Sequence, residues 1–294
     1  MTLLVLDMGG TFIKYGYWEN NHINNVQKFK TPTSYTDLKK NIQQLINDSK
    51  RNIQGLAISA PGVVDQNERI IKGISAIPYI HHFPIFDDLE SSLNLPVYIE
   101  NDANCAGFSE MTHGVGTASE NAVFIILGTG VGGSIFINRK LYKGTNNFAG
   151  EFGLSLTTDG ALSYTGSIVK ASHQYSQLAS ETVNGEELFK RKEKGDKLAT
   201  ELIEKFYNNL AEFLYNIQVI LDPDLIAIGG GVSAQKEISE VLEMKLKAKL
   251  QKNELENFMP KIKTCQYANN ANLIGAAAFF EQSKKENENV KVSI

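Results

Sequence analysis

The stretch IENDANCAGF, residues 99–108, places an aspartate at the point where a short apolar strand gives way to a helix. Residues 97–99 predict the strand, and Asp102 is well suited to cap the helix that follows. In an open α/β sheet, a carboxylate in this place lies at the carboxyl edge of the strands and faces a cleft. A helix cap is the ordinary role of such an aspartate, so the rest of the chain has to decide whether Asp102 also carries chemistry.

Strand-like and helix-like segments alternate along the chain, which predicts the α/β class. Residues 3–6 and 13–18 predict a hairpin closed by a glycine pair. Residues 122–127 and 134–138 repeat this hairpin around a second glycine turn. Because the same order of elements recurs, the sequence predicts a duplicated fold of two lobes around a central cleft.

The second half of the chain adds a long helix, predicted over residues 196–221 from apolar residues at helical spacing. Residues 225–228 then predict a strand that enters three consecutive glycines, and a final helix is predicted to begin near Ala271. These elements divide the chain into two predicted lobes, residues 1–118 together with 272–294, and residues 119–271.

Composition limits the class of protein. The 294 residues are 42% apolar and 21% charged, which is ordinary for a soluble globular chain with a large core. A net charge of -4 argues against a nucleic-acid-binding surface. The apolar start of the chain has no basic flank and ends at Asp7, so it predicts no signal peptide, and no run is long enough to cross a membrane. Two widely spaced cysteines, Cys105 and Cys265, favour the reducing cytoplasm.

Two glycine turns join predicted strands. In the first, the amides of Gly9 and Gly10 and the hydroxyl of Thr11 can face an anion, although a plain β-turn explains this turn equally well. The second, GTGVGG at residues 128–133, has the GxGxxG spacing of dinucleotide sites, but a strand follows it where that motif requires a helix. The Walker pattern is absent as well. Two such hairpins, one from each half, are suited to hold the phosphates of a nucleotide from opposite sides.

Together these motifs resemble the ROK family of sugar kinases and repressors, within the actin and hexokinase superfamily. The resemblance covers nearly the whole chain, and its landmarks fall in the family's order. They are the first phosphate motif (7–11), the sugar-side loop (60–65), the catalytic segment (100–110), the second phosphate motif (128–133), the sugar-gripping loop (149–153) and the adenosine motif (221–233). The resemblance implies a two-lobed, actin-like ATPase fold, which is ribonuclease H-like, with lobes that close over the sugar.

The resemblance also implies ATP-dependent phosphorylation of a sugar hydroxyl. Asp102 is the implied general base, which takes the proton as the hydroxyl attacks the γ-phosphate, and Asp7 is implied to hold Mg²⁺ through water. The residues implied to bind the sugar are Gly62, Val63, Asn101, Asp102 and Glu151. The residues implied to bind the nucleotide are Asp7, Gly9, Gly10, Thr11, Gly128, Thr129, Gly130, Gly132, Gly230 and Gly231.

The chain departs from the family pattern after residue 151. Members usually carry a histidine, a cysteine-rich zinc knot and a second sugar-binding glutamate there. This chain has Leu154 in place of the histidine and, from Ser155 to Ser172, no cysteine, histidine or glutamate. We therefore predict a protein without zinc. Because the lost groups contact the anomeric end of glucose, we favour a β-glucoside such as cellobiose, phosphorylated on its 6-hydroxyl.

Other functions stay open on the sequence alone. An N-acetylmannosamine kinase or a glucokinase fits the same motifs. A sugar-responsive transcriptional regulator of the same family would carry a DNA-binding helix-turn-helix, and we expect none because the first phosphate motif begins at Asp7. An inactive binding module is disfavoured because Asp7, Asp102 and Glu151 are all present. The resemblance also implies a homodimer.

Overall fold

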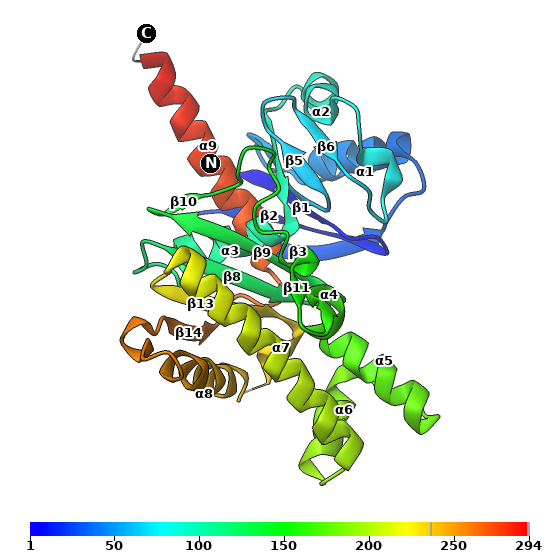
Figure 1. Cartoon of the computed structure of the whole chain (residues 1–294). Helices are drawn as coiled ribbons and strands as arrows, with labels where there is room; N and C mark the ends of the chain where they lie inside the picture. Colours follow the sequence, from blue (N-terminus) through cyan, green and yellow to red (C-terminus); the bar gives the residue numbers. More distant parts are fainter. Residues whose placement is uncertain (236, 293–294) are drawn as a thin grey trace. The chain divides into compact units, whose positions relative to one another are not determined.

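The computed structural model describes residues 1–235 and 237–292, with side chains through residue 289 (Figure 1). The chain forms two compact units, one of Met1–Thr112 with the chain from Asn269 onward, and the other of His113–Ala268. Each unit contains its own five-stranded sheet. No helix in the described part of the chain has both the length and the apolar character needed to cross a membrane.

The sheet of the first unit joins a hairpin to parallel strands. Its strands are β1 (Leu3–Met8), β2 (Phe12–Glu19), β3 (His22–Lys30), β4 (Leu56–Ala60) and β7 (Val97–Asn101), in the order β3-β2-β1-β4-β7. β1 pairs antiparallel with β2 and parallel with β4, which in turn pairs parallel with β7. Every residue of β4 and nearly every residue of β1 is buried, as expected for central strands covered on both faces. The parallel strands therefore end together at one edge of the sheet.

Helices and a small second sheet complete the first unit. They are α1 (Tyr35–Asp48), α2 (Ile85–Leu93), α3 (Asp102–His113), α9 (Ala271–Val292), the short η1 (Pro78–Ile80), and the strands β5 (Val63–Asp65) and β6 (Ile70–Lys72). α9 packs on β1, β4 and β7. A Cβ atom on Gly275 would lie only 1.6 Å from the carbonyl oxygen of Cys105, so α9 and α3 cross backbone to backbone at this glycine.

The sheet of the second unit repeats this pattern. Its strands are β8 (Ala122–Leu127), β9 (Val131–Ile137), β10 (Lys140–Leu141), β13 (Leu225–Gly230) and β14 (Lys261–Thr264), in the order β10-β9-β8-β13-β14. β8 pairs antiparallel with β9 and parallel with β13, and β13 pairs parallel with β14. The antiparallel hairpin followed by parallel strands confirms the duplication that the sequence predicts.

The remaining elements of the second unit enclose its core. They are the helices α4 (Leu162–Thr165), α5 (Ile168–Ala179), α6 (Gly185–Glu193), α7 (Lys197–Leu221) and α8 (Ile238–Gln251), the short helices η2 (Phe152–Leu154), η3 (Gly231–Ala234) and η4 (Glu256–Phe258), and the two-residue strands β11 (Leu156–Thr157) and β12 (Gly160–Ala161).

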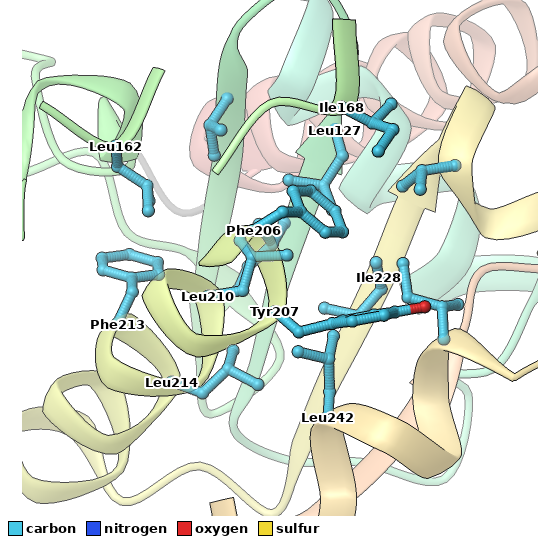
Figure 2. Packing of buried hydrophobic residues seen from close by; sticks show 14 of the residues in the cluster. Leu127, Leu162, Ile168, Phe206, Tyr207, Leu210, Phe213, Leu214, Ile228 and Leu242 are labelled. Atoms are coloured by element: carbon cyan, nitrogen blue, oxygen red, sulfur yellow. The ribbon is translucent and has the colours of Figure 1, made fainter. Parts of the chain in front are cut away.

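The predicted long helix is confirmed as α7, which begins after Asp196 because that side chain accepts a hydrogen bond from the Ala199 amide. Figure 2 shows its apolar face, with Phe206, Leu210 and Leu214 packed among buried side chains of neighbouring elements. These side chains form the core of the second unit, as the helical spacing indicates.

Candidate active site

The turn from β7 to α3 differs from the predicted one in a single detail. The Oδ1 atom of Asn101 accepts hydrogen bonds from the amides of Ala103 (2.9 Å) and Asn104 (3.1 Å), so Asn101 is the residue that caps the helix. The expectation that Asp102 is the cap is wrong, because the helix already begins at Asp102 directly after the strand, which leaves Asn101 at the cap position, where Asn serves as well as Asp. Asp102 is instead the first residue of α3, half-buried, with Oδ1 accepting from the Ala103 amide at 2.8 Å.

The buried carboxylate of Glu100 holds this turn through hydrogen bonds. Glu100 is fully buried, and its Oε1 accepts from the amide of Asn101 (2.8 Å) and from Nδ2 of Asn104 (3.0 Å). Nε2 of Gln66 donates to Oε2 of Glu100 at 3.3 Å and to the carbonyl of Ile99 at 2.6 Å. A buried charge is stable only when it is hydrogen-bonded in this way. Sequence reasoning assigned Glu100 no role, and its position beside the aspartate was the only available signal.

Asp7 lies at the same edge of the first sheet. In the strand register Asp7 pairs with Ser59, and Ser59 pairs with Glu100 on the next strand. Oδ1 of Asp7 accepts from Oγ of Ser59 (3.2 Å) and from Nδ2 of Asn272 (2.9 Å), which comes from the first turn of α9. The structure thus adds two residues, Ser59 and Asn272, that hold a predicted ligand side chain in place.

The thiol of Cys105 lies under the turn from β7 to α3, where its Sγ donates to the carbonyl oxygen of Glu100 at 3.8 Å. Burial raises the pKa of this thiol well above its ordinary value, and the negative charges of Glu100, Asp102 and Asp7 raise it further. This cysteine is the small buried side chain that the sequence indicates.

The first glycine turn lies beside Asp7. A Cβ atom would lie 2.7 Å from the carbonyl oxygen of Phe12 if built on Gly9, and 2.6 Å from Cβ of Ala76 if built on Gly10. Close approach, and not a positive φ angle, therefore requires both glycines. The Gly9 amide donates to the Phe12 carbonyl at 3.1 Å. No described residue accepts a hydrogen bond from the amides of Gly10 or Thr11, which suits them to an anion.

The predicted sugar-side loop is tied to the β7–α3 turn. Nδ2 of Asn101 donates to the carbonyl of Gly62 at 3.0 Å and keeps a second N–H for other partners. Gly62 has a φ of +106°, and a Cβ there would lie 2.9 Å from Cε1 of the buried His81. Val63 follows as the first residue of β5. The predicted residues Gly62, Val63, Asn101 and Asp102 are therefore neighbours.

The second glycine turn connects β8 to β9 and not to a helix, which confirms that it is no dinucleotide fingerprint. The Gly128 amide donates to the Gly130 carbonyl at 2.9 Å and closes the turn. Within the described residues, no acceptor faces the amides of Thr129 or Gly130. Gly132 lies in β9 itself, where it pairs with Ile126.

The segment that carries Glu151 rests on this hairpin. A Cβ atom on Gly133 would lie 2.2 Å from the Phe152 ring, and one on Gly150, whose φ is +95°, would lie 2.7 Å from the Gly133 carbonyl oxygen. These close contacts present Glu151 on the surface of the second unit. The surrounding protein limits hydration of its carboxylate and raises the pKa of Glu151.

A cavity of about 430 Å³ opens beside the second hairpin. Gly128 and Gly231, far apart in the sequence, both line it, and apolar side chains form most of its wall. The other lining residues are Leu127, Ile168, Val169, Gly185, Glu186, Phe189, Val232, Ala234 and Gln235. Gly230 lies next to Gly231 with a φ of +86°, and a Cβ there would lie 2.1 Å from the Leu127 carbonyl oxygen. The size and apolar wall suit a flat aromatic base, with phosphates at the Gly128 end.

Residues 3–283 of the chain match the ROK family. The chain is 31% identical over 303 residues to a beta-glucoside kinase of Listeria monocytogenes, an alignment that covers 98% of this chain and 100% of the relative. It is 30% identical over 295 residues to a beta-glucoside kinase of Klebsiella pneumoniae, covering 96% of this chain and 97% of the relative.

A solved structure resembles the whole chain. The crystal structure of a ROK family protein from Streptococcus pneumoniae, in complex with sucrose, aligns with a TM-score of 0.89 at 33% identity. The alignment covers 97% of this chain and 100% of that protein. The predicted α/β fold of the actin-like ATPase class is confirmed.

Proposed function

Because the chain belongs to the ROK family, we propose that it is a carbohydrate kinase that transfers the γ-phosphate of ATP to a hydroxyl of a sugar, with Asp102 as the general base. The strongest support is the edge of the first sheet, where Asp7 near the end of β1 and Asn101 and Asp102 at the end of β7 flank the central strand β4. The second unit supplies a glycine hairpin beside a cavity suited to a base, and the amides of Thr129 and Gly130 in this hairpin have no acceptor among the described residues.

The first unit orients and deprotonates the sugar in this proposal. Asn101 keeps one N–H for a ring hydroxyl, while the loop at Gly62 and Val63 limits the room around the ring. The Asp102 carboxylate is held at the start of α3 and accepts the proton of the hydroxyl as that oxygen attacks the γ-phosphorus. The bond from the γ-phosphorus to the bridging oxygen breaks, and ADP leaves. Glu151 of the second unit accepts hydrogen bonds from further hydroxyls of the sugar.

Both hairpins bind phosphate oxygens through backbone amides, those of Gly10 and Thr11 and those of Thr129 and Gly130. Mg²⁺ fits this site, since a single carboxylate with water and substrate phosphates is how proteins usually hold it. Asp7 would hold the ion, and when bound it would neutralise charge on the phosphates. The predicted lobes, residues 1–118 with 272–294 and residues 119–271, close over the sugar and exclude water in this proposal.

A β-glucoside is the proposed substrate, phosphorylated on the 6-hydroxyl. Leu154, where the family usually has histidine, is 62% exposed and offers no hydrogen bond to an anomeric hydroxyl. Two relatives at 30–31% identity are beta-glucoside kinases, and the Streptococcus pneumoniae relative binds sucrose, a disaccharide. A substituent at the anomeric carbon therefore suits this chain better than a free hydroxyl does.

A panel of acceptors with ATP tests the proposed function. Cellobiose and phenyl β-glucoside should give higher kcat/KM than glucose or N-acetylmannosamine, because residue 154 has no group that can hydrogen-bond a free anomeric hydroxyl. The variant Leu154→His should shift the preference toward glucose, whereas Leu156→His, at another exposed leucine two residues later, should not. Inert β-glucosides, with glucose or an N-acetylhexosamine used best, would contradict the proposed substrate.

We also propose that the chain holds no zinc and works as a homodimer in the cytoplasm. The zinc ligands of the family are missing between Ser155 and Ser172, and both cysteines are free thiols. Metal analysis of the purified protein should find no stoichiometric zinc, and sedimentation should give twice the chain mass. One tightly held zinc ion per chain would contradict the first statement, and a monomer would contradict the second.

A further inference from the structure

Ser167 makes a hydrogen bond that is unusual for its place in the fold. It is the N-cap residue of α5, where a serine ordinarily accepts a hydrogen bond from an amide of the first helical turn. Its side chain makes no such bond. The hydroxyl instead lies 3.2 Å from the carbonyl oxygen of Gly128 and 3.1 Å from that of Thr129, and Ser167 is only 1% exposed. It therefore shares its one hydrogen between two carbonyls of the second glycine turn.

This contact determines where the amides of the turn point. In a planar trans peptide the C=O and N–H bonds point in opposite directions. With the carbonyls of Gly128 and Thr129 held toward Ser167, the N–H groups of Thr129 and Gly130 are directed away from it. Among the described residues no acceptor faces these two amides, and they are the ones proposed to bind phosphate.

A second serine fixes the other end of the turn. The hydroxyl of Ser163, in α4, accepts a hydrogen bond from the amide of Val131 at 3.3 Å. Ser163 fits against two glycines, since a Cβ on Gly130 would lie 3.2 Å and one on Gly153 2.1 Å from its oxygen. Both serines lie in the segment 155–172, which carries none of the zinc ligands usual in the family.

The first glycine turn has a comparable contact. Oγ1 of Thr31 donates to the carbonyl of Gly9 at 2.6 Å, and the Thr31 amide donates to the carbonyl of Thr11 at 3.0 Å. By the same peptide geometry, the bond to Gly9 directs the Gly10 amide away from Thr31. A hydroxyl that holds carbonyls of a phosphate turn thus occurs independently in each unit.

We propose that Ser167 is a positioning residue for the nucleotide: its hydroxyl holds the second glycine turn in the one orientation that presents the Thr129 and Gly130 amides to phosphate oxygens. This role rests on the proposed function only in that the ligand is ATP. It predicts that loss of the hydroxyl weakens nucleotide binding and leaves sugar binding unchanged, because an unconstrained turn must be ordered on binding.

Calorimetric titration with a non-hydrolysable ATP analogue tests this role on the full chain. Ser167→Ala should weaken binding about tenfold and raise the KM for ATP by a similar factor, with the KM for the sugar within about twofold. Ser167→Thr, which keeps a hydroxyl, should restore most of the affinity. The matched control is Ser172→Ala, on the same helix, because Ser172 is equally buried but bonds only the Val169 carbonyl of its own helix.

The outcomes separate this role from the proposed function. Nucleotide affinity of Ser167→Ala equal to that of Ser172→Ala would overturn the positioning role while leaving the kinase intact. If Ser167→Ala lowers the melting temperature and weakens sugar and nucleotide binding by the same factor, the positioning role is also overturned, since such a result would indicate a purely structural role. If the unmodified chain binds the analogue but phosphorylates no sugar in the panel, the proposed function fails while the titration still decides the role of Ser167. A chain that binds no nucleotide would overturn both.

Discussion

The two glycine hairpins, residues 8–12 of the first unit and 127–131 of the second, share a scaffold and differ in their surroundings. Each joins antiparallel strands, the first of which also pairs with a parallel strand. The first hairpin lies beside Asp7 and close to the strand that leads to Asp102. The second lies beside an apolar cavity and supports the segment of Glu151. The duplicated scaffold thus carries acid groups beside one copy of the hairpin and an apolar cavity beside the other.

The glycines in and beside the two hairpins are required for different reasons. Gly9 and Gly10 are required by neighbouring atoms alone, whereas Gly230, beside the second hairpin, combines a positive φ with a predicted clash. A side chain at Gly230 therefore meets both backbone strain and a rigid carbonyl. We expect substitution at Gly230 to be tolerated less well than substitution at Gly9 or Gly10.

The largest effect should come from Gly230→Ala. Its Cβ would lie 2.1 Å from the Leu127 carbonyl oxygen at a φ of +86°, so the free energy of unfolding should fall by about 2–4 kcal/mol in urea titrations. Gly9→Ala, with 2.7 Å and no positive φ, should cost about 1–2 kcal/mol. Gly231→Ala, where no atom lies within 4 Å, should change stability by less than about 0.5 kcal/mol. The reverse order would contradict the comparison.

A smaller effect is expected from Asn272→Ala in the first unit. It removes the donor at 2.9 Å from Asp7, so the carboxylate loses its fixed orientation, and Mg²⁺ affinity should fall about tenfold. Magnesium dependence of turnover and direct titration with Mn²⁺ would both measure this. Asn287→Ala is the matched control, because Asn287 lies on the same helix and bonds Tyr98. Equal metal affinities in the two variants would remove the assigned role of Asn272.

The smallest effect concerns the pH dependence of sugar binding. Loss of hydration near the surrounding protein raises the pKa of Glu151, so this carboxylate takes up a proton at a higher pH than an ordinary glutamate. The protonated form is a poorer acceptor, and the KM for the sugar should therefore rise a few-fold as the pH falls through that raised pKa, while it stays constant at neutral pH. Glu151→Gln should have a flat KM profile over the same range. If the KM of Glu151→Gln instead rises at low pH as it does in the unmodified chain, the pH dependence belongs to another group.

Much of this arrangement could be predicted from the sequence. The α/β class, the repeated hairpin, the long helix α7, the family and the carbohydrate-kinase class are confirmed, because periodic apolar spacing and glycine turns are local signals. The separate roles of the site residues stay predictions. Gly128 of the second turn and Gly231 line one cavity, and their role in binding a nucleotide stays a prediction.

Contacts between remote segments could not be predicted in this way. Asn272 meets Asp7 only because Gly275 lets α9 cross α3, and no local pattern encodes that crossing. Ser167 is a serine before a helix, which predicts a cap, yet the nearby turn takes its hydrogen bond. At the start of α3 two adjacent residues, Asn101 and Asp102, are both good helix caps. The sequence could not decide between them, because the choice depends on the residue at which the helix begins, and Asn101 is the cap.

In the proposed reaction the Asp102 carboxylate takes the proton of the sugar hydroxyl, and the variant Asp102→Asn removes this proton acceptor. The variant keeps the size of the side chain, so folding and the affinities for sugar and ATP should stay within about threefold, while kcat falls about a hundredfold or more. Asp37→Asn, at an exposed carboxylate in the first turn of α1, should keep full turnover. Unchanged kcat in Asp102→Asn, measured with the sugar that the unmodified chain uses best, would rule out Asp102 as the general base.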